Sequence, residues 1–426
     1  MTSMKESGID WIGQIPEEWE VAKVNHIFEE HKQKNRGNKE KNLLSLSYGR
    51  IIRKSIDSSF GLLPESFETY NIIQRGDIVL RLTDLQNDKR SLRVGLAREN
   101  GIITSAYLTL RLKNLESNDS YMYYLLHTYD ICKVFYNFGG GVRQGGTWSD
   151  IYKMELLIPP CNEQQKIADF LDKKTAQLDK AKALLEEQIR KLKDYRASLI
   201  YETVTKGLDK TVPLKDSGID WIGQVPEGWG VTKIKNIVNI ERGASPRPID
   251  KFISDDGTGV NWIRIGDTHK GIKYITSTKL KITNRGKQYS RYIHPGTLIL
   301  SNSMSFGEPY ISSIYGCIHD GWLSLAPFNN ISKEYLYWLL LSDVCTSQFN
   351  LVSIGAVVEN LSVDKVGNTL IPMPYSLSEQ TKISDFLDKK TVQIDQLIQI
   401  KNKQIDNINK QRQTLIYDYV TGKRRV

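Results

Sequence analysis

The sequence has few cysteines and no long apolar run. Its four cysteines, Cys132, Cys161, Cys317 and Cys345, lack the spacing of a metal site, and free cysteines suit a reducing compartment. No stretch approaches the roughly 18 apolar residues that a membrane-spanning helix needs, and the N-terminus has no signal-peptide core. These absences predict a cytoplasmic protein without a structural zinc site, a disulfide or a membrane anchor.

Acidic residues are missing from one long window. No Asp or Glu occurs between Thr268 and Gly307, and the whole chain has a net charge of +9. Two thinner basic stretches lie at 32–54 and 89–113. Clustered Lys and Arg neutralise phosphates and release counterions, which gives affinity for nucleic acid irrespective of base sequence. The window therefore favours a nucleic-acid partner over a solvated face, and it argues against a coiled-coil scaffold unrelated to DNA.

Motifs of self-contained catalysis are also absent. The chain has no G-x-x-x-x-G-K-[ST] loop for an ATP motor, and its six histidines show no metal-binding spacing. The run 138–141 resembles a loop that cradles S-adenosylmethionine only superficially, and 159–162 lacks the aromatic residue that would stack a flipped base. We therefore expect no catalytic residue, metal or cofactor on this chain. A self-contained DNA methyltransferase or nuclease is the alternative.

Two segments recur in the same order along the chain. Residues 5–28 return at 215–238 with 15 of 24 positions identical, and residues 167–175 return at 383–391 with eight of nine identical. The stretches between them are dissimilar. So long a period excludes a solenoid and indicates a tandem duplication of whole units. We expect the repeated ends to form a scaffold and the different middles to form two different readers.

Two long segments lack the residues that break helices. Neither Pro nor Gly occurs within 163–206 or 379–421, and each run is followed directly by Gly. This predicts two helices of about 44 residues, each roughly 65 Å long. Asn162 and Ser378 stand where N-caps are expected.

Apolar residues recur every seven positions along both predicted helices. A row that keeps this spacing implies a left-handed supercoil with a partner helix. We therefore expect the helices to pair with each other, although each could instead lie on its own domain. The expected interface residues are Leu171, Leu178, Leu185, Leu192, Leu199, Leu387, Ile394, Ile408 and Leu415. An antiparallel pair would hold the two reading domains apart on a DNA duplex. The length of the helix pair would then set the spacing between the two half-sites.

The dissimilar middles read as mixed α/β. Strands are expected at 77–82, 106–112, 262–265 and 297–300, and each middle ends in an expected helix, at 120–134 and 332–346, before an apolar strand that runs into proline. The expected fold class is α+β, with two mixed α/β domains and two long helices that pair either parallel or antiparallel in a pseudo-two-fold repeat. The expected domains are 1–158 and 211–374, with conserved helices at 159–210 and 375–426.

Four motifs in this order resemble the specificity subunit of type I restriction-modification systems. They are Ser7–Trp19, Glu163–Thr175, Ser217–Trp229 and Glu379–Thr391. The departures are small: Thr381 replaces the second glutamine found at Gln165, and Cys161-Asn162 interrupts the usual proline-rich exit. The resemblance covers the full chain, because the variable middles stand where target-recognition domains belong.

The resemblance implies that the two long helices pair as an antiparallel coiled coil that joins two target-recognition domains. It also implies a non-catalytic subunit that reads double-stranded DNA, one half of a bipartite, asymmetric site with each recognition domain. It further implies two modification subunits, which use S-adenosylmethionine to methylate adenine. Restriction subunits complete an ATP-dependent endonuclease for phage defence. S-adenosylmethionine, ATP and Mg are expected on those partners and not on this chain.

The base-contacting residues do not carry over from the family, so they are chosen from chemistry. Arg and Lys read guanine edges or phosphates, and Gln reads adenine. The first-domain candidates are Arg81, Lys89, Arg90, Arg93, Arg143 and Gln144. The second-domain candidates are Arg242, Arg247, Lys270, Lys273, Lys279, Lys281, Arg285, Lys287 and Arg291. The tryptophans Trp11, Trp19, Trp221 and Trp229 recur in both scaffold segments and are expected to pack rather than to stack on bases.

Overall fold

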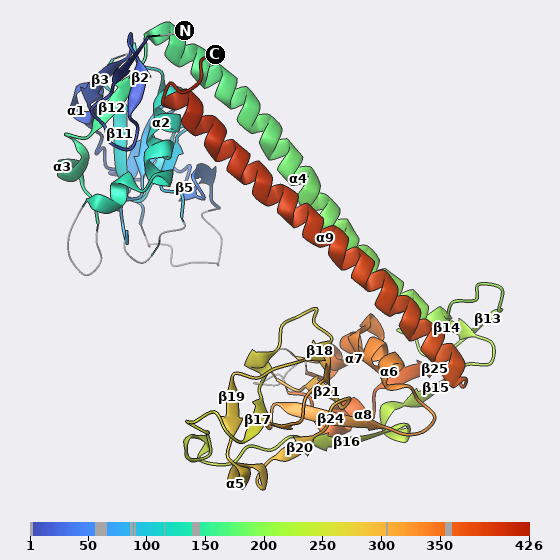
Figure 1. Ribbon diagram of the computed structural model, residues 1–426. Helices are drawn as coiled ribbons and strands as arrows, with labels where there is room; N and C mark the ends of the chain where they lie inside the picture. Colours follow the sequence, from blue (N-terminus) through green and yellow to red (C-terminus); the bar gives the residue numbers. More distant parts are fainter. Residues whose placement is uncertain are drawn as a thin grey trace. The chain divides into compact units, whose positions relative to one another are not determined.

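The computed structural model divides into two compact units. It describes residues 3–55, 66–85, 88, 91–114, 116–138, 145–303, 306–353 and 360–426. The first unit combines Met1–Glu186 with Asn402–Val426, and the second comprises Glu187–Lys401. Both chain termini therefore belong to the first unit, where Figure 1 shows them at the same end. Each unit contains one domain and a segment of each long helix.

The two long helices form because nothing in their sequences interrupts them. The helix α4 spans Cys161–Lys206 and α9 spans Leu377–Val420. Each is stopped by a glycine with positive φ, Gly207 at +67° and Gly422 at +71°, as is usual at helix C-termini. The helix α4 begins and α9 ends in the first unit, whereas α4 ends and α9 begins in the second.

The expected N-caps are wrong by two residues. Asn162 and Ser378 both lie inside the helices, which begin at Cys161 and Leu377. At α4 the carbonyl of Pro160 accepts from the N–H of Glu163, and at α9 the hydroxyl of Ser376 accepts from the N–H of Glu379 at 3.4 Å. The residue immediately before each helix thus satisfies one of the orphan N–H groups of the first turn.

The domain of the first unit is built from short antiparallel strands and the 13-residue helix α2. Its central sheet has the order β4-β11-β8-β9, and β3 pairs with β12. The helix α2 covers this sheet, with Tyr121, Leu125 and Tyr129 fully or almost fully buried in the core. Its elements are β1 Met4–Glu6, β2 Gln14–Pro16, β3 Glu20–Lys23, α1 Val24–Ile27, β4 Phe28–Glu30, β5 Leu44–Ser47, β6 Arg50–Arg53, β7 Asn71–Ile73, β8 Ile78–Leu80, β9 Val94–Leu96, β10 Gly101–Ile103, β11 Leu108–Leu112, α2 Asp119–Ile131, η1 Val134–Asn137, α3 Trp148–Ile151 and β12 Glu155–Ile158.

The main sheets of the second unit have five and four strands. A five-stranded sheet has the order β16-β24-β21-β22-β18, and a four-stranded sheet has the order β19-β17-β23-β20. Its elements are β13 Leu214–Asp216, β14 Gln224–Pro226, β15 Gly230–Lys233, η2 Ile234–Asn236, β16 Val238–Arg242, η3 Ile249–Lys251, β17 Val260–Ile263, η4 Ile265–Asp267, β18 Tyr274–Ile275, β19 Leu280–Ile282, α5 Asn284–Lys287, β20 Arg291–Ile293, β21 Leu298–Ser301, β22 Pro309–Ser312, β23 Gly316–Ile318, β24 Trp322–Pro327, α6 Lys333–Leu341, α7 Asp343–Ser353, α8 Val363–Gly367 and β25 Leu370–Met373.

The expected strands and helices are present with shifted ends, except for one helix. The helix expected at 332–346 is two helices, α6 and α7, which meet at Ser342. Ser342 has extended backbone angles, and its carbonyl accepts from the N–H groups of Cys345 and Thr346. The break was not visible in the sequence because neither Pro nor Gly marks it.

Each repeated scaffold segment places one tryptophan in the core of its unit. Trp19 and Trp229 are buried, and Trp11 packs against the core beside Tyr129. Trp221 departs from the expected packing role, since it is 41% exposed.

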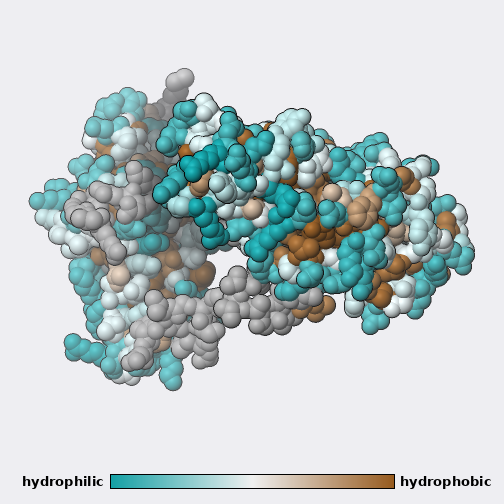
Figure 2. All heavy atoms as spheres, turned by 90° about the horizontal axis from the view of Figure 1, so that it is seen from below, coloured by the Kyte–Doolittle hydropathy of each residue, from teal (hydrophilic) through white to brown (hydrophobic). Residues whose placement is uncertain are grey.

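Among the described residues no helix has both the length and the apolar character to cross a membrane. The face drawn in Figure 2 is mostly hydrophilic, with hydrophobic residues gathered in limited groups.

Candidate nucleic-acid interface

The two long helices contact each other within each unit. In the first unit the beginning of α4 meets the end of α9, where the rings of Phe170 and Tyr419 are 4.5 Å apart. In the second unit the end of α4 meets the beginning of α9, where Arg196 Nε lies 3.6 Å from Asp395 Oδ1. The helix segments are therefore antiparallel in each unit, as the family resemblance implied.

The expected interface residues of the helices differ in burial. Leu171 and Leu387 are fully buried in the two domain cores, and Ile394 is also buried. Ile189, which lies outside the seven-residue row, is buried as well. The half-buried members of the row are Leu178, Leu185, Leu192, Leu199, Ile408 and Leu415. The left-handed supercoil stays a prediction.

Two lysines of the acid-free window have opposite surroundings. The side chain of Lys270 is 87% exposed and reaches Glu308 at 2.9 Å. The side chain of Lys273 is only 13% exposed, and its Nζ lies 2.6 Å from a carboxylate oxygen of Asp388 on α9. Lys273 also lies 5.4 Å from the Trp338 ring centroid. This placement does not support the expected DNA contact of Lys273, because the charge is already used to attach the domain to the helix.

The other basic residues of the window lie nearer the surface. Lys279 and Arg285 are exposed, and Lys281 is half-buried. Lys287 places its Nζ 3.6 Å from the ring centroid of Tyr292, and Arg291 pairs with Glu241 at 3.0 Å.

The first-domain candidates are only partly covered by the described residues. Lys89, Arg90, Arg143 and Gln144 lie outside them. Arg81 is half-buried, with its Nη2 at 3.6 Å from Asp88 Oδ2.

Arg93 is fully buried beneath the first-domain surface. Its Nη1 donates to the carbonyls of Arg81 and Thr83 at 3.0 and 2.7 Å. Its backbone N–H donates to Asp130. A buried guanidinium that donates its hydrogen bonds to backbone carbonyls cannot reach a base edge. This geometry indicates a structural role for Arg93 and not the expected DNA contact.

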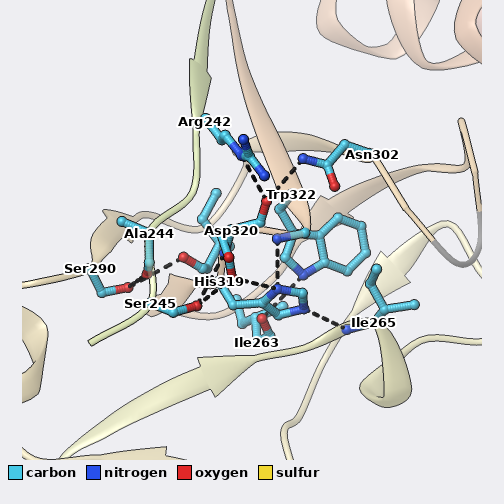
Figure 3. A network of polar contacts seen from close by, with 12 residues as sticks. Arg242, Ala244, Ser245, Ile263, Ile265, Ser290, Asn302, His319, Asp320 and Trp322 are labelled. Atoms are coloured by element: carbon cyan, nitrogen blue, oxygen red, sulfur yellow. Dashed lines mark hydrogen bonds and ion pairs between the residues drawn. The ribbon is translucent and has the colours of Figure 1, made fainter. Parts of the chain in front are cut away.

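Arg242 and Arg247 meet at one acidic residue of the second domain. Arg242 Nε donates to the backbone carbonyl of Asp320 at 3.0 Å, and Arg247 Nη2 lies 3.1 Å from Asp320 Oδ2. Ser245 Oγ donates to Asp320 Oδ1 at 2.5 Å, and Asn302 Nδ2 donates to the Asp320 carbonyl at 2.9 Å. Figure 3 shows Arg242, Ser245 and Asn302 converging on Asp320.

The neighbouring residue His319 is half-buried. Its Nδ1 lies 2.7 Å from the backbone nitrogen of Gly321 and 3.7 Å from Asp320 Oδ1, and its Nε2 lies 3.2 Å from the backbone nitrogen of Ile265. A neutral ring can accept a hydrogen bond at only one of its two nitrogens, because the other nitrogen carries a proton. Burial lowers the pKa of His319, against the opposing effect of Asp320. The hydrogen bond from Ser245, by contrast, lowers the pKa of the Asp320 carboxyl, so Asp320 is ionised at neutral pH.

A cavity of about 1090 Å³ opens beside this network. Its lining combines apolar side chains with the cations Arg247, Arg264 and Lys279 and with the carboxylates of Asp250 and Asp320. It is lined by Ser245, Pro246, Arg247, Pro248, Ile249, Asp250, Ile253, Trp262, Arg264, Ile265, Gly266, Lys279, Leu280, His319 and Asp320.

Sequence reasoning identified Arg247 and Lys279 of this cavity but missed other polar residues. These are Ser245, Asp250, Arg264, His319 and Asp320. One signal could have pointed to Asp320, because it is the only acid between Glu308 and Glu334. Nothing local, however, indicates its pairing with Ser245, which is 75 residues away.

Among the residues that the structure describes, no group of three or more His, Cys, Asp or Glu side chains is arranged to hold a metal ion.

Comparison with known proteins gives consistent results for both halves of the chain. The chain is 24% identical over 427 residues to the type I restriction enzyme MjaVIII specificity subunit of Methanocaldococcus jannaschii. This alignment covers 97% of this chain and 94% of that protein. It is also 24% identical over 269 residues to the type I restriction enzyme EcoBI specificity subunit of Escherichia coli, covering 61% of this chain and 56% of that protein.

Solved structures share the fold at low sequence identity. A chain from a structure of the complex assembly and conformational transition of the type I R-M system superimposes with a TM-score of 0.71 at 16% identity, covering 95% of this chain and 98% of that one. The HsdS subunit from Thermoanaerobacter tengcongensis gives 0.52 at 15% identity, covering 96% and 98%.

The family model of the type I restriction modification DNA specificity domain matches the chain twice, at residues 16–192 and 226–410. These two matches cover well over half of the 426 residues. The chain therefore belongs to the type I restriction-modification DNA specificity family and carries two copies of its domain.

Proposed function

We propose that each recognition domain of this DNA specificity subunit reads one half of a bipartite, asymmetric DNA site. The observation that carries the proposal is one scaffold used twice around dissimilar middles. In both units a tryptophan of the entry segment and a glutamate of the long helix form the same hydrogen bond, Trp19 with Glu163 and Trp229 with Glu379. A two-part, non-palindromic DNA site requires two different recognition domains, and the repeated scaffold holds each of them in the same way.

The helix pair is proposed to set the spacing between the two half-sites. Each long helix begins beside one recognition domain and ends beside the other. A helix rises about 1.5 Å per residue, so its uninterrupted length converts a residue count into a distance along the DNA. The antiparallel contacts within each unit support this role.

The chain is proposed to act without chemistry of its own, as a docking platform for partners. Two modification subunits would carry S-adenosylmethionine and methylate adenine in the two strands of the site. Restriction subunits would add ATP- and Mg-dependent cleavage. The similarity to named type I specificity subunits supports these partners. A cytoplasmic location is part of the same proposal.

Modified-base sequencing tests this function directly. The chain is co-expressed with its cognate modification subunit, and the methylated positions in cellular DNA are mapped. An interrupted, asymmetric motif with one methylated adenine per strand is expected, and no methylation is expected from either protein alone. Methylation by this chain alone would establish the alternative, a self-contained methyltransferase. No new methylation from a co-purifying complex would contradict the proposed reading role.

A further inference from the structure

Arg247 projects from a rigid segment at the rim of the second-domain cavity. The prolines Pro246 and Pro248 flank it, and proline fixes its own φ and restricts the residue before it. Gly243 in the same segment approaches the connection between β23 and β24 so closely that a Cβ there would lie 2.0 Å from the carbonyl oxygen of His319. The backbone that carries Arg247 is therefore held in place before any ligand arrives.

The same segment is tied to its surroundings by backbone hydrogen bonds. The N–H of Gly243 donates to the carbonyl of Trp322 at 2.8 Å, and the N–H of Ala244 donates to that of Ile318 at 3.1 Å. Ser290 Oγ donates to the carbonyl of Ala244 at 2.7 Å. These bonds anchor the segment immediately before the Pro-Arg-Pro sequence.

The Arg247 side chain is oriented by one contact, and most of its guanidinium remains exposed. Its side chain is 80% exposed, and its Nη2 lies 3.1 Å from Asp320 Oδ2. In the described part of the chain no hydrogen bond engages its Nε or Nη1. Asp320 is itself fixed, because Ser245 donates to its other carboxylate oxygen. An anchored carboxylate thus holds one edge of the guanidinium and leaves donors free for a ligand.

We propose that Arg247, oriented by Asp320, is a specificity-determining residue that reads a guanine in the second half-site. This rests on the proposed function of the subunit. Guanine presents two acceptors, O6 and N7, in the major groove, and the planar fork of Arg matches them with two parallel hydrogen bonds. Because the side chain is already oriented, less conformational entropy is lost on binding, and the wrong base is penalised more strongly. A phosphate contact needs no such orientation.

The surroundings of Arg247 fit a polyanion. Arg264 and Lys279 also line the cavity, and the Arg264 side chain is 35% exposed. Trp262 and Leu280 supply apolar surface beside them. We assign Lys279 to the phosphate backbone, because a flexible, exposed ammonium gives affinity without discrimination between bases.

Arg53 in the first domain provides a matched control. It is also an exposed arginine paired with a carboxylate, with a side chain that is 73% exposed. Its Nε and Nη2 both bind Glu99, so the edge that would read a guanine is already occupied. Replacing it should leave the second half-site unchanged.

The test selects bound duplexes from a library in which both half-sites are randomised. The full chain is used in complex with its modification subunits, as wild type and as Arg247→Ala, Arg247→Lys, Lys279→Ala and Arg53→Ala. In Arg247→Ala the preference for guanine at one position of one half-site should fall by roughly 5- to 150-fold, with the other positions unchanged. Arg247→Lys should retain part of that preference, since a lysine cannot form the bidentate pair. Arg53→Ala should select the wild-type motif.

Two outcomes would overturn the assignment of Arg247. Equal weakening for all sequences in Arg247→Ala, with a salt dependence reduced by about one phosphate contact, would make it a phosphate contact. An unchanged motif would remove it from the interface. Lys279→Ala should instead weaken all sequences equally. If wild type itself selects no motif, the proposed function fails first, which separates that failure from a failure of Arg247.

Asp320→Asn tests the orienting role separately. It should relax the same single position as Arg247→Ala, to a smaller extent. Relaxation at a different position, or none in a variant whose melting temperature matches wild type, would show that Asp320 does not orient Arg247.

Discussion

Trp19 donates a hydrogen bond from its indole Nε1 to the carboxylate of Glu163 at 3.0 Å, in the core of the first unit. The two residues are 144 positions apart, and one comes from the entry segment and the other from the first turn of α4. Arg425, near the chain's C-terminus, pairs with the same carboxylate at 2.7 Å. A single buried glutamate therefore joins the beginning, the middle and the end of the chain.

Removing the indole donor should destabilise the first unit. Trp19→Phe leaves the carboxylate of buried Glu163 without one hydrogen bond, which costs about 1–3 kcal/mol of unfolding free energy. Chemical denaturation of the full chain measures this loss. Trp221→Phe is the matched control and should change the free energy by less than about 0.5 kcal/mol, because Trp221 is 41% exposed. Equal effects of the two substitutions would show that the hydrogen bond contributes nothing.

Two neighbouring lysines should behave differently despite their similar sequence context. Lys273→Ala removes the partner of Asp388 and should lower stability by about 1–3 kcal/mol, since Lys273 is mostly buried. Lys270→Ala should have almost no effect on stability, because its side chain is 87% exposed. Thermal unfolding of both variants checks the difference. A loss of DNA affinity in Lys273→Ala at unchanged stability would restore its originally expected role.

Charge reversal in the acid-free window should weaken DNA binding without changing base preference. In the combined variant Lys279→Glu, Lys281→Glu and Lys287→Glu, the slope of log affinity against log salt should flatten by up to about 3, one phosphate contact for each lysine. Affinity of the full complex is measured at several salt concentrations. Unchanged affinity and slope would exclude these lysines from the interface.

Exchange of one recognition domain should alter only one half of the target. Replacing residues 232–370 with the corresponding segment of another family member leaves the Trp229–Glu379 hydrogen bond in place, so the new domain should be held in the same way. Modified-base sequencing should reveal one new half-site beside one retained half-site. A change in both halves would contradict independent reading by the two domains.

Acid should destabilise the first unit through His127. Burial lowers the pKa of His127 from 6.5 to about 4, with a further lowering from Arg412, and its Nδ1 has no hydrogen-bond partner in the described structure. Its contribution to stability is therefore complete above pH 6.5 and is lost as the pH falls toward 4, because only the unfolded chain takes up the proton there. The loss is on the order of 3 kcal/mol.

His127→Phe isolates this contribution from other titrating groups. Denaturant unfolding of both proteins at pH 8, 6 and 5 gives the difference in pH dependence. The variant should lose less stability than wild type between pH 8 and 5. Parallel curves for the two proteins would mean that His127 is not held neutral.

Local sequence determined the long helices and the repeat. The helices at 161–206 and 377–420 follow from runs without Pro or Gly, and Gly207 and Gly422 end them at positive φ. The strands of the middles were also predictable, because apolar alternation and turn residues act over a few positions. The family follows in the same way from contiguous motifs that the sequence displays directly.

Only the tertiary structure decided what each polar side chain does. Lys270 and Lys273 look alike in sequence, yet one is exposed and the other is paired with Asp388, which is 115 residues away. Arg93 was expected at the DNA and is instead buried among backbone carbonyls. The role of a charged group depends on solvent and on partners that folding brings from distant parts of the chain, and local sequence contains neither.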